Sequence, residues 1–304
     1  MTPADHFPAA VGLTWAEVGG GLSGARVWRG DDAGAVPRAA LKQLPDGFPA
    51  DRLRQVHEWM RAARLAVVPA VFDAGSDTVL EHGGRVWECL AWVAGEPLLG
   101  RPPTRSCGLA LGGGQPPDAL KAAYAALAAL HRAWAPVAQP AAPPPCVARR
   151  RSLYAEVAPH LSHPPSHLRR AVAVLHSNLP AAIATLAPLV ALGPVQPCLC
   201  DPRPEHFLFT GDALTGVIDY AAMKADHPAV DLARLLLDTG FLEAGVAAYH
   251  AAAGTPAVTV ELVRALADTG RVGAVANWVL RLRHREPTPA EAARLERLLE
   301  GMVH

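Results

Sequence analysis

Two aspartates and a histidine follow one another in a proline-containing stretch, in the order Asp201, His206 and Asp219. Pro202 and Pro204 fix their own backbone angles, so the loop can hold Asp201 rigid and exposed, as a base that accepts a hydroxyl proton requires. His206 follows five residues later, and Asp219 stands eighteen residues after Asp201, behind an apolar run. A base followed by two ligands for a metal ion and its phosphates is the order of groups that phosphoryl transfer needs.

Short strands are expected to bring Asp201 and Asp219 together. Residues 207–209 have the pattern of a short buried strand, 211–212 that of a turn, and 214–218 that of a second strand that delivers Asp219. Two carboxylates at the ends of such a hairpin can converge on one cation. The competing interpretation is that each aspartate only caps a turn, as a loop aspartate often does.

Two features nearer the start of the chain could bind phosphate. Gly20, Gly21 and Ser23 belong to a glycine-rich turn between two strand-like stretches, and glycine lets backbone N–H groups approach a phosphate closely. Most such turns bind nothing, so this one is weak support by itself. Lys42 lies in an apolar strand about twenty residues further on, the setting of a lysine that contacts nucleotide phosphates. The alternative for Lys42 is a solvated position on a strand edge.

A lysine in that setting normally pairs with a glutamate on the next helix. Glu58 is the candidate, in a helix expected over residues 51–65. The apolar stripe of this helix consists of Leu53, Val56, Met60 and Ala63. Glu58 lies nearly opposite that stripe on a helical wheel, whereas His57 lies nearer its edge. Either Glu58 faces the cleft while the stripe packs elsewhere, or the usual ion pair is missing and Glu58 is solvated.

The composition indicates a globular chain with room for two lobes. It has 304 residues, of which 51% are hydrophobic and 18% charged, enough for a sizeable core. A formal net charge of +0 gives no support to nucleic-acid binding. No run of about 18 uncharged apolar residues or signal-peptide pattern is present, so no membrane association is expected. The 5 cysteines are an odd, sparse set, which favours reduced thiols and a cytoplasmic location.

The order of elements indicates an α+β fold. Strand-like segments and one helix fill roughly the first hundred residues, a stretch rich in Pro and Gly covers 100–117, and helices dominate thereafter. We expect a small N-terminal antiparallel-sheet lobe over residues 1–91, which binds nucleotide. The larger helical C-terminal lobe, residues 92–304, should carry the catalytic loop and the acceptor site. The oligomeric state is left open.

Residues 200–236 resemble the aminoglycoside phosphotransferase and choline kinase-like family. The resemblance rests on Cys200-Asp201 followed by His206, on Val217-Ile218-Asp219-Tyr220, and on Asp226-His227-Pro228 followed by Asp231-Leu232-Ala233. It implies a bilobal, protein-kinase-like fold and transfer of the γ-phosphate of ATP or GTP to a hydroxyl of a small metabolite or antibiotic-like acceptor. It also implies that Asp201 is the catalytic base, Asp219 the main Mg²⁺ ligand and Asp231 a brace of the catalytic loop.

Two positions depart from the family's pattern of His-Gly-Asp followed by Asn. Leu199 stands where the family has His, and we expect it only to pack. His206 stands where the family has Asn, a metal ligand. An imidazole can bind a divalent ion, but Mg²⁺ prefers oxygen, so His206 could instead bond a phosphate or favour Mn²⁺.

The resemblance further implies an adenine site and an acceptor site. Residues 87–92, within a strand expected over 85–93, should form the hinge between the lobes, with backbone groups of Cys89 and Ala91 bonded to an adenine edge. Arg203 and Glu205, inside the loop, are candidate acceptor contacts. The last helices carry several arginines, which disfavours a strongly cationic acceptor unless these side chains only form a solvated face.

The main alternative to a small-molecule kinase is a pseudokinase, a protein that binds nucleotide or acts as a scaffold without catalysis. Leu199, His206 and the doubtful orientation of Glu58 motivate it. A protein kinase is a third, weaker interpretation, because the chain lacks the segment from Asp-Phe-Gly to Ala-Pro-Glu that those enzymes carry.

Overall fold

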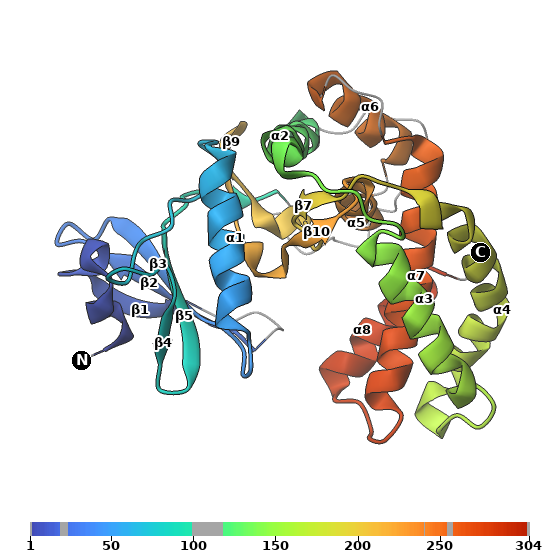
Figure 1. The fold of residues 1–304 in the computed structure, drawn as a ribbon. Coiled ribbons are helices and arrows are strands. Elements are labelled where there is room, and N and C mark those ends of the chain that lie inside the picture. The colour runs from blue at the N-terminus through green and yellow to red at the C-terminus, as the bar shows by residue number, and fades with distance from the viewer. Residues whose placement is uncertain (1, 19–23, 99–117, 240, 254–257, 303–304) are drawn as a thin grey trace.

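The computed structural model describes residues 2–18, 24–98, 118–239, 241–253 and 258–302. An antiparallel sheet with one helix forms one side of the molecule, and a helical part forms the other (Figure 1). The short strands β7 and β10 lie between them near the middle of the view. The arrangement is the α+β, two-part fold expected from the order of elements.

The N-terminal sheet is antiparallel throughout, in the order β1-β2-β3-β5-β4. Its strands are β1 (Thr14–Val18), β2 (Arg26–Asp31), β3 (Pro37–Gln43), β4 (Leu80–His82) and β5 (Arg85–Ala91). Lys42 on β3 stands directly opposite Glu88 on β5, so these two side chains share one face of the sheet. The last strand of the sheet in chain order ends at Ala91, after which the chain crosses to the helical part.

Helix α1 (Ala50–Ala63) joins the two parts of the molecule. Its apolar stripe is buried: Leu53 packs with Leu44 and Val79 beside the sheet, while Val56 and Met60 belong to the core of the helical part. The helix therefore stands between the sheet and the helices (Figure 1).

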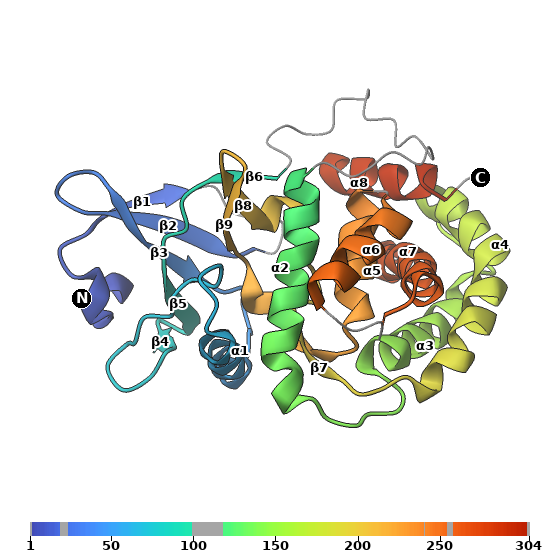
Figure 2. The same ribbon diagram turned by 90° about the horizontal axis from the view of Figure 1, so that it is seen from above.

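The helical part is built around α7, which packs against α3, α4 and α5. Its helices are α2 (Asp118–Trp134), α3 (Pro145–Val157), α4 (Arg169–Leu186), α5 (Ala229–Thr239), α6 (Leu242–Ala253), α7 (Val260–Leu282) and α8 (Pro289–Glu300). Helix α2 runs along the side that faces the sheet, and α8 covers one end of the helical part (Figure 2).

Two small sheets carry the loops that matter for chemistry. One pairs β7 (Gln196–Cys198) with β10 (Lys224–Asp226), and the other has the order β6-β8-β9. The latter consists of β6 (Glu96–Pro97), β8 (Phe207–Thr210) and β9 (Ala213–Val217). Strands β8 and β9 form the antiparallel hairpin expected from the sequence pattern.

The segment Ser166–Ala191, which contains α4, is long and apolar enough to cross a membrane by length and composition. In the structure α4 packs against α7 and α3, with Leu175, Leu179 and Leu186 buried. A helix at the side of a protein core has the same composition, so this segment adds no argument for a membrane.

Candidate active site

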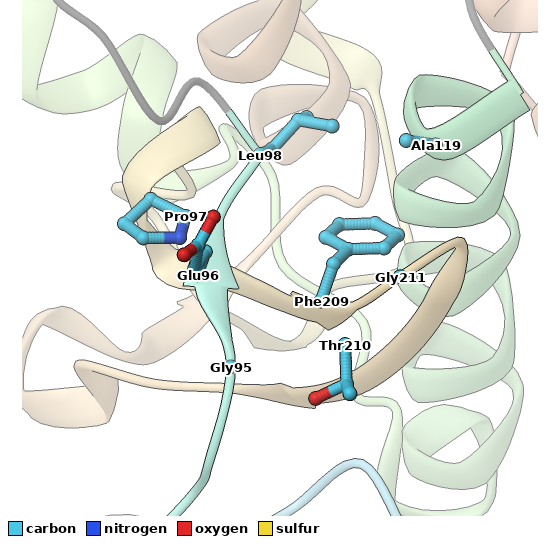
Figure 3. A pocket seen from close by; sticks show the side chains of 8 residues that line it. All are labelled: Gly95, Glu96, Pro97, Leu98, Ala119, Phe209, Thr210 and Gly211. Atoms are coloured by element: carbon cyan, nitrogen blue, oxygen red, sulfur yellow. The ribbon is translucent and has the colours of Figure 1, made fainter.

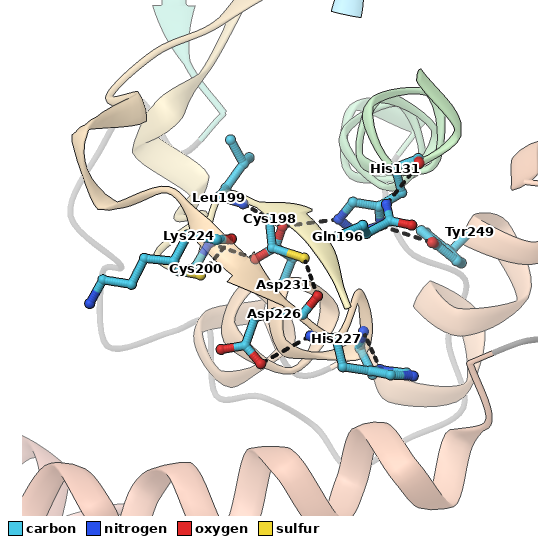
Figure 4. Close-up of polar contacts among 11 residues, drawn as sticks. His131, Gln196, Cys198, Leu199, Cys200, Lys224, Asp226, His227, Asp231 and Tyr249 are labelled. Carbon is cyan, nitrogen blue, oxygen red and sulfur yellow. Dashed lines mark hydrogen bonds and ion pairs between the residues drawn. The ribbon is translucent and has the colours of Figure 1, made fainter. Parts of the chain in front are cut away.

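A buried carboxylate holds the backbone of the loop that carries Asp201. Asp231, 0% exposed near the start of α5, accepts a hydrogen bond from Leu199 N at 2.8 Å and one from Cys200 N at 2.7 Å (Figure 4). Cys200 has a φ of 64°, a left-handed conformation that a non-glycine residue keeps only when its surroundings hold it. Asp231 thus fixes the backbone immediately before Asp201.

A chain of hydrogen bonds continues from Asp231 into α2 and α6. His131 Nε2 lies 3.0 Å from Asp231 Oδ2, and Tyr249 Oη lies 2.9 Å from His131 Nδ1 (Figure 4). Because an ionised carboxylate only accepts, His131 donates through Nε2 and its Nδ1 accepts the tyrosine hydroxyl. Gln196 Nε2 donates to the carbonyl of His131 at 2.7 Å. Three helices and β7 therefore share the support of the loop.

Ligand-type atoms of His131, Cys198 and Asp231 lie within 4.8 Å of one another, all of them buried. They do not form a convincing metal centre, because each already has hydrogen-bond partners. The Cys198 thiol donates to the carbonyl of Asp226 at 3.3 Å. Burial and the nearby carboxylates raise the pKa of Cys198, which disfavours the thiolate that a metal ion requires.

Asp201 is partly exposed and held by two arginines. Arg203 Nε donates to one carboxylate oxygen at 3.0 Å, and Arg234 Nε donates to the other at 2.7 Å. Arg203 also lies 3.6 Å from Glu205, so both acceptor candidates in the loop sit beside Asp201. The pair of guanidinium groups fixes the carboxylate and surrounds it with positive charge.

Asp219 forms an ion pair with Lys42 of the N-terminal sheet. Lys42 Nζ lies 2.6 Å from Asp219 Oδ1, a contact between residues 177 apart in sequence. Asp219 adopts a left-handed backbone, with φ 65° and ψ 61°, at the end of the β9 hairpin. Burial acts to raise its pKa, but Lys42, His206 and Arg203 outweigh that effect, so the pKa of Asp219 is lowered and the carboxylate is ionised.

His206 lies next to Asp219, with Nε2 3.7 Å from Asp219 Oδ2. Burial lowers its pKa, against the opposing effect of the nearby carboxylates, so the ring is neutral at pH 7. The donor set fits a magnesium ion: Asp219 offers the oxygen that Mg²⁺ prefers, and nucleotide phosphates and water can complete its coordination. His206 offers a ring nitrogen, which also suits Mn²⁺ or a phosphate oxygen.

The expected pair between Lys42 and Glu58 is absent, which corrects the sequence interpretation. Glu58 is exposed and accepts a hydrogen bond from Gln55 Nε2 at 2.8 Å on the same helix. The inward residue of α1 is its neighbour His57, which contacts Glu88 on β5. Sequence reasoning missed Glu88, although an acidic residue inside an otherwise apolar strand was a usable signal.

The adenine contact expected at Cys89 and Ala91 stays a prediction, but two of these backbone groups have partners within the protein. The Cys89 carbonyl accepts a hydrogen bond from Phe72 N at 2.9 Å, and Ala91 N donates to the carbonyl of Ala70 at 2.8 Å. These two groups are therefore engaged with the segment before β4. The glycine-rich turn with Gly20, Gly21 and Ser23 lies outside the described residues.

A pocket of about 540 Å³ lies beside the β6–β8 sheet and the start of α2 (Figure 3). It is lined by Gly95, Glu96, Pro97, Leu98, Ala119, Phe209, Thr210 and Gly211. The lining contains none of the charged groups around Asp201 and Asp219. We therefore do not equate this pocket with the centre of the chemistry.

Solved structures with the same fold are phosphotransferases. Spectinomycin phosphotransferase, in complex with ADP and spectinomycin, is 10% identical, with 95% of this chain and 92% of that chain covered and a TM-score of 0.65. An aminoglycoside phosphotransferase from Alicyclobacillus acidocaldarius is 15% identical, with coverages of 96% and 89% and a TM-score of 0.63. Macrolide 2′-phosphotransferase from Brachybacterium faecium is 18% identical, with coverages of 95% and 92% and a TM-score of 0.58. At these identities the likeness shows the fold.

A search of curated proteins found no match to the sequence. The model of the phosphotransferase enzyme family, in contrast, matches residues 14–266, which include the sheet, the loop of Asp201 and most of the helical part. The chain belongs to the phosphotransferase enzyme family.

Proposed function

We propose that this protein transfers the γ-phosphoryl group of ATP or GTP to a hydroxyl group of a small molecule. The observation that carries the proposal is the convergence of Lys42 and Asp219, 2.6 Å apart, beside a loop whose Asp201 is fixed by Asp231 through the backbone. A lysine, a metal-binding carboxylate and a base are the groups that position phosphates and an attacking hydroxyl. Four free cysteines among the described residues favour the reducing cytoplasm as its location.

Asp201 accepts the proton of the attacking hydroxyl in this mechanism. Its two oxygens are held by Arg203 and Arg234, which fixes the direction of the lone pairs. Each of these oxygens has a second lone pair, so a hydroxyl group can bond Asp201 while both arginine contacts remain. Proton acceptance by a positioned base contributes roughly 10²–10⁴-fold to such reactions.

Asp219 and Lys42 act on the nucleotide. A bound Mg²⁺ ion would neutralise phosphate charge there, and Asp219 would hold it with help from His206 or water. Lys42 would lie beside the phosphates, where its ammonium group would oppose their negative charge. Most of the rate gain in this scheme comes from positioning and electrostatics.

The acceptor in this proposal is neutral or anionic rather than polycationic. Arg203 and Arg234 both donate hydrogen bonds from their guanidinium groups to Asp201. Arg294 on α8 lies near these two arginines. Burial and these two arginines lower the pKa of Arg294. An acceptor with several ammonium groups would be repelled from such a setting.

The direct test is phosphoryl transfer from γ-labelled ATP or GTP to panels of hydroxyl compounds, sorted into cationic, neutral and anionic classes. We expect labelled product with Mg²⁺ from a neutral or anionic class, and none with Asp201→Asn. Transfer that is unchanged in Asp201→Asn would contradict the assigned base. Transfer confined to polycationic acceptors would contradict the acceptor class while leaving the reaction intact.

One observation favours a second candidate, a nucleotide-binding protein without catalysis. Both oxygens of Asp201 are engaged by arginines, and His206 stands in the position of a metal-ligating Asn. This candidate predicts a Mg²⁺-dependent increase of the melting temperature with ATP or GTP but no labelled product from any acceptor. Labelled product from any panel would exclude it.

A further inference from the structure

A buried hydrogen-bonded pair joins helix α1 to strand β5 beside Lys42. His57 Nε2 lies 2.8 Å from Glu88 Oε2, and the two residues are 0% and 3% exposed. The carboxylate only accepts, so the ring donates through Nε2. The other ring nitrogen, Nδ1, has no hydrogen-bond partner among the described residues. The imidazole of His57 therefore has one directed polar contact, and that contact is Glu88.

Glu88 is also the cross-strand neighbour of Lys42. The β3–β5 register sets the two residues directly opposite, and such pairs have Cβ atoms about 4.5–5.5 Å apart on one face of the sheet. Lys42 thus has two carboxylate neighbours, one on its own sheet and one at the β9 hairpin.

We propose that Glu88 is the positioning carboxylate of Lys42, in place of the glutamate expected on α1, and that His57 holds Glu88 in this role. This inference rests on the proposed function, because it assigns Lys42 to the nucleotide phosphates. Lys42 contacts Asp219 at 2.6 Å in the structure. A metal ion held by Asp219 would compete with Lys42 for that carboxylate, and Glu88 would still anchor the ammonium group near the phosphates.

Because Glu88 lies on strand β5, the sheet rather than helix α1 sets its distance from Lys42. Strands β3 and β5 are joined by backbone hydrogen bonds, so their register sets the spacing of Lys42 and Glu88 without any contribution from α1. A glutamate on α1 would move whenever the helix moved relative to the sheet. Here α1 contacts Glu88 through His57, and Glu88 in turn is the neighbour of Lys42.

The competing explanation is that Glu88 only docks α1 on the sheet through His57. Glu88→Gln separates the two explanations, because the amide oxygen can still accept the hydrogen bond from His57 while the negative charge is lost. Docking is then retained and only the partner charge of Lys42 is removed. Glu58→Gln is the matched control, since Glu58 is the helix glutamate that the sequence suggested and it is exposed.

The experiment is a double-mutant cycle on nucleotide affinity with wild type, Lys42→Met, Glu88→Gln and the double variant. Dissociation constants are measured with a fluorescent ATP analogue and Mg²⁺, with no need for an acceptor or for turnover. We expect Glu88→Gln to weaken binding about tenfold when Lys42 is present and less than about twofold in the Lys42→Met background. Glu58→Gln should change affinity less than about twofold in both backgrounds.

An equal effect of Glu88→Gln in both backgrounds, or no effect in either, would overturn the proposal, because a purely structural residue acts independently of Lys42. A second double-mutant cycle on the same four proteins measures their free energies of unfolding in urea, without nucleotide. Non-additive losses of stability support the pairing of Lys42 with Glu88, and additive losses overturn it. A protein that binds no nucleotide but shows non-additive stability keeps the pairing and loses the proposed function, so the two failures are distinguishable.

Discussion

Replacing Asp231 with asparagine should strongly destabilise the fold around the loop of Asp201. The buried carboxylate accepts hydrogen bonds from Leu199 N, Cys200 N and His131 Nε2, and all three distances are at most 3.0 Å. An asparagine oxygen can replace only one carboxylate oxygen, so its NH₂ group must face a donor. If the oxygen keeps Leu199 and His131, the N–H of Cys200 is left buried and unpaired.

The size of the loss follows from those contacts. A buried unpaired donor costs about 1–3 kcal/mol, and two hydrogen bonds that lose a charged acceptor each weaken by about 1 kcal/mol. We therefore expect Asp231→Asn to lower the free energy of unfolding by about 3–5 kcal/mol, with a further loss of turnover because the loop backbone relaxes. Urea unfolding followed by circular dichroism measures the first effect, and γ-phosphate transfer measures the second.

Asp268→Asn on α7 is the matched control for this experiment. Asp268 is an exposed helix aspartate with a single ion pair to Arg271 at 3.3 Å, so its replacement should change stability by less than about 0.5 kcal/mol. A loss below about 1 kcal/mol for Asp231→Asn would refute the reasoning. It would mean that the loop finds other partners and that Asp231 does not fix it.

Three further predictions concern single groups. Asp201→Asn should lower turnover by about 10²–10⁴-fold and leave nucleotide affinity unchanged, as labelled transfer and calorimetry can show. Asp219→Ala should abolish the Mg²⁺-dependent part of nucleotide affinity, measured by calorimetry with and without the ion; an unchanged Mg²⁺ dependence would exclude Asp219 as a ligand. Burial lowers the pKa of His227, whose Nδ1 accepts from Ala229 N at 3.2 Å. The unfolded state therefore binds the proton more readily, and stability should be constant above pH ~6.5 and fall below it by at most about 1.4 kcal/mol per pH unit. Urea titrations between about pH 5 and 7 test this, and His227→Gln should lack that part of the slope.

Features that depend on residues close in sequence were predictable. The hairpin that follows Asp201 was readable because its strands and turn are contiguous and its first strand is a short apolar run. The helix bearing Glu58 was also readable from its apolar stripe. The family membership followed from the spacing of three aspartates, which requires no knowledge of long-range contacts.

Features that depend on register between distant segments were not predictable. Glu58 was favoured as the partner of Lys42 because the following helix is the usual source of that carboxylate, whereas the pairing of β3 with β5 brings Glu88 instead. The backbone of Cys89 was expected to be available, but an irregular segment at Phe72 bonds it. An acidic residue inside an apolar strand marked Glu88 as unusual, but neither strand register nor the path of an irregular segment leaves a local signal of its partner.

The replacement of Asn by His206 is less disruptive than residue type alone suggests. Burial lowers the pKa of His206 and so keeps its imidazole uncharged. A neutral ring has one donor and one acceptor nitrogen, as the asparagine amide has a donor NH₂ group and an acceptor oxygen. His206 therefore adds no formal charge to those of Lys42, Asp201 and Asp219, just as an amide would add none. What changes is the donor atom offered to a metal ion, nitrogen in place of oxygen. This difference should appear as a shift in preference from Mg²⁺ toward Mn²⁺, and His206→Asn should reverse it, as nucleotide affinities measured with each ion would show.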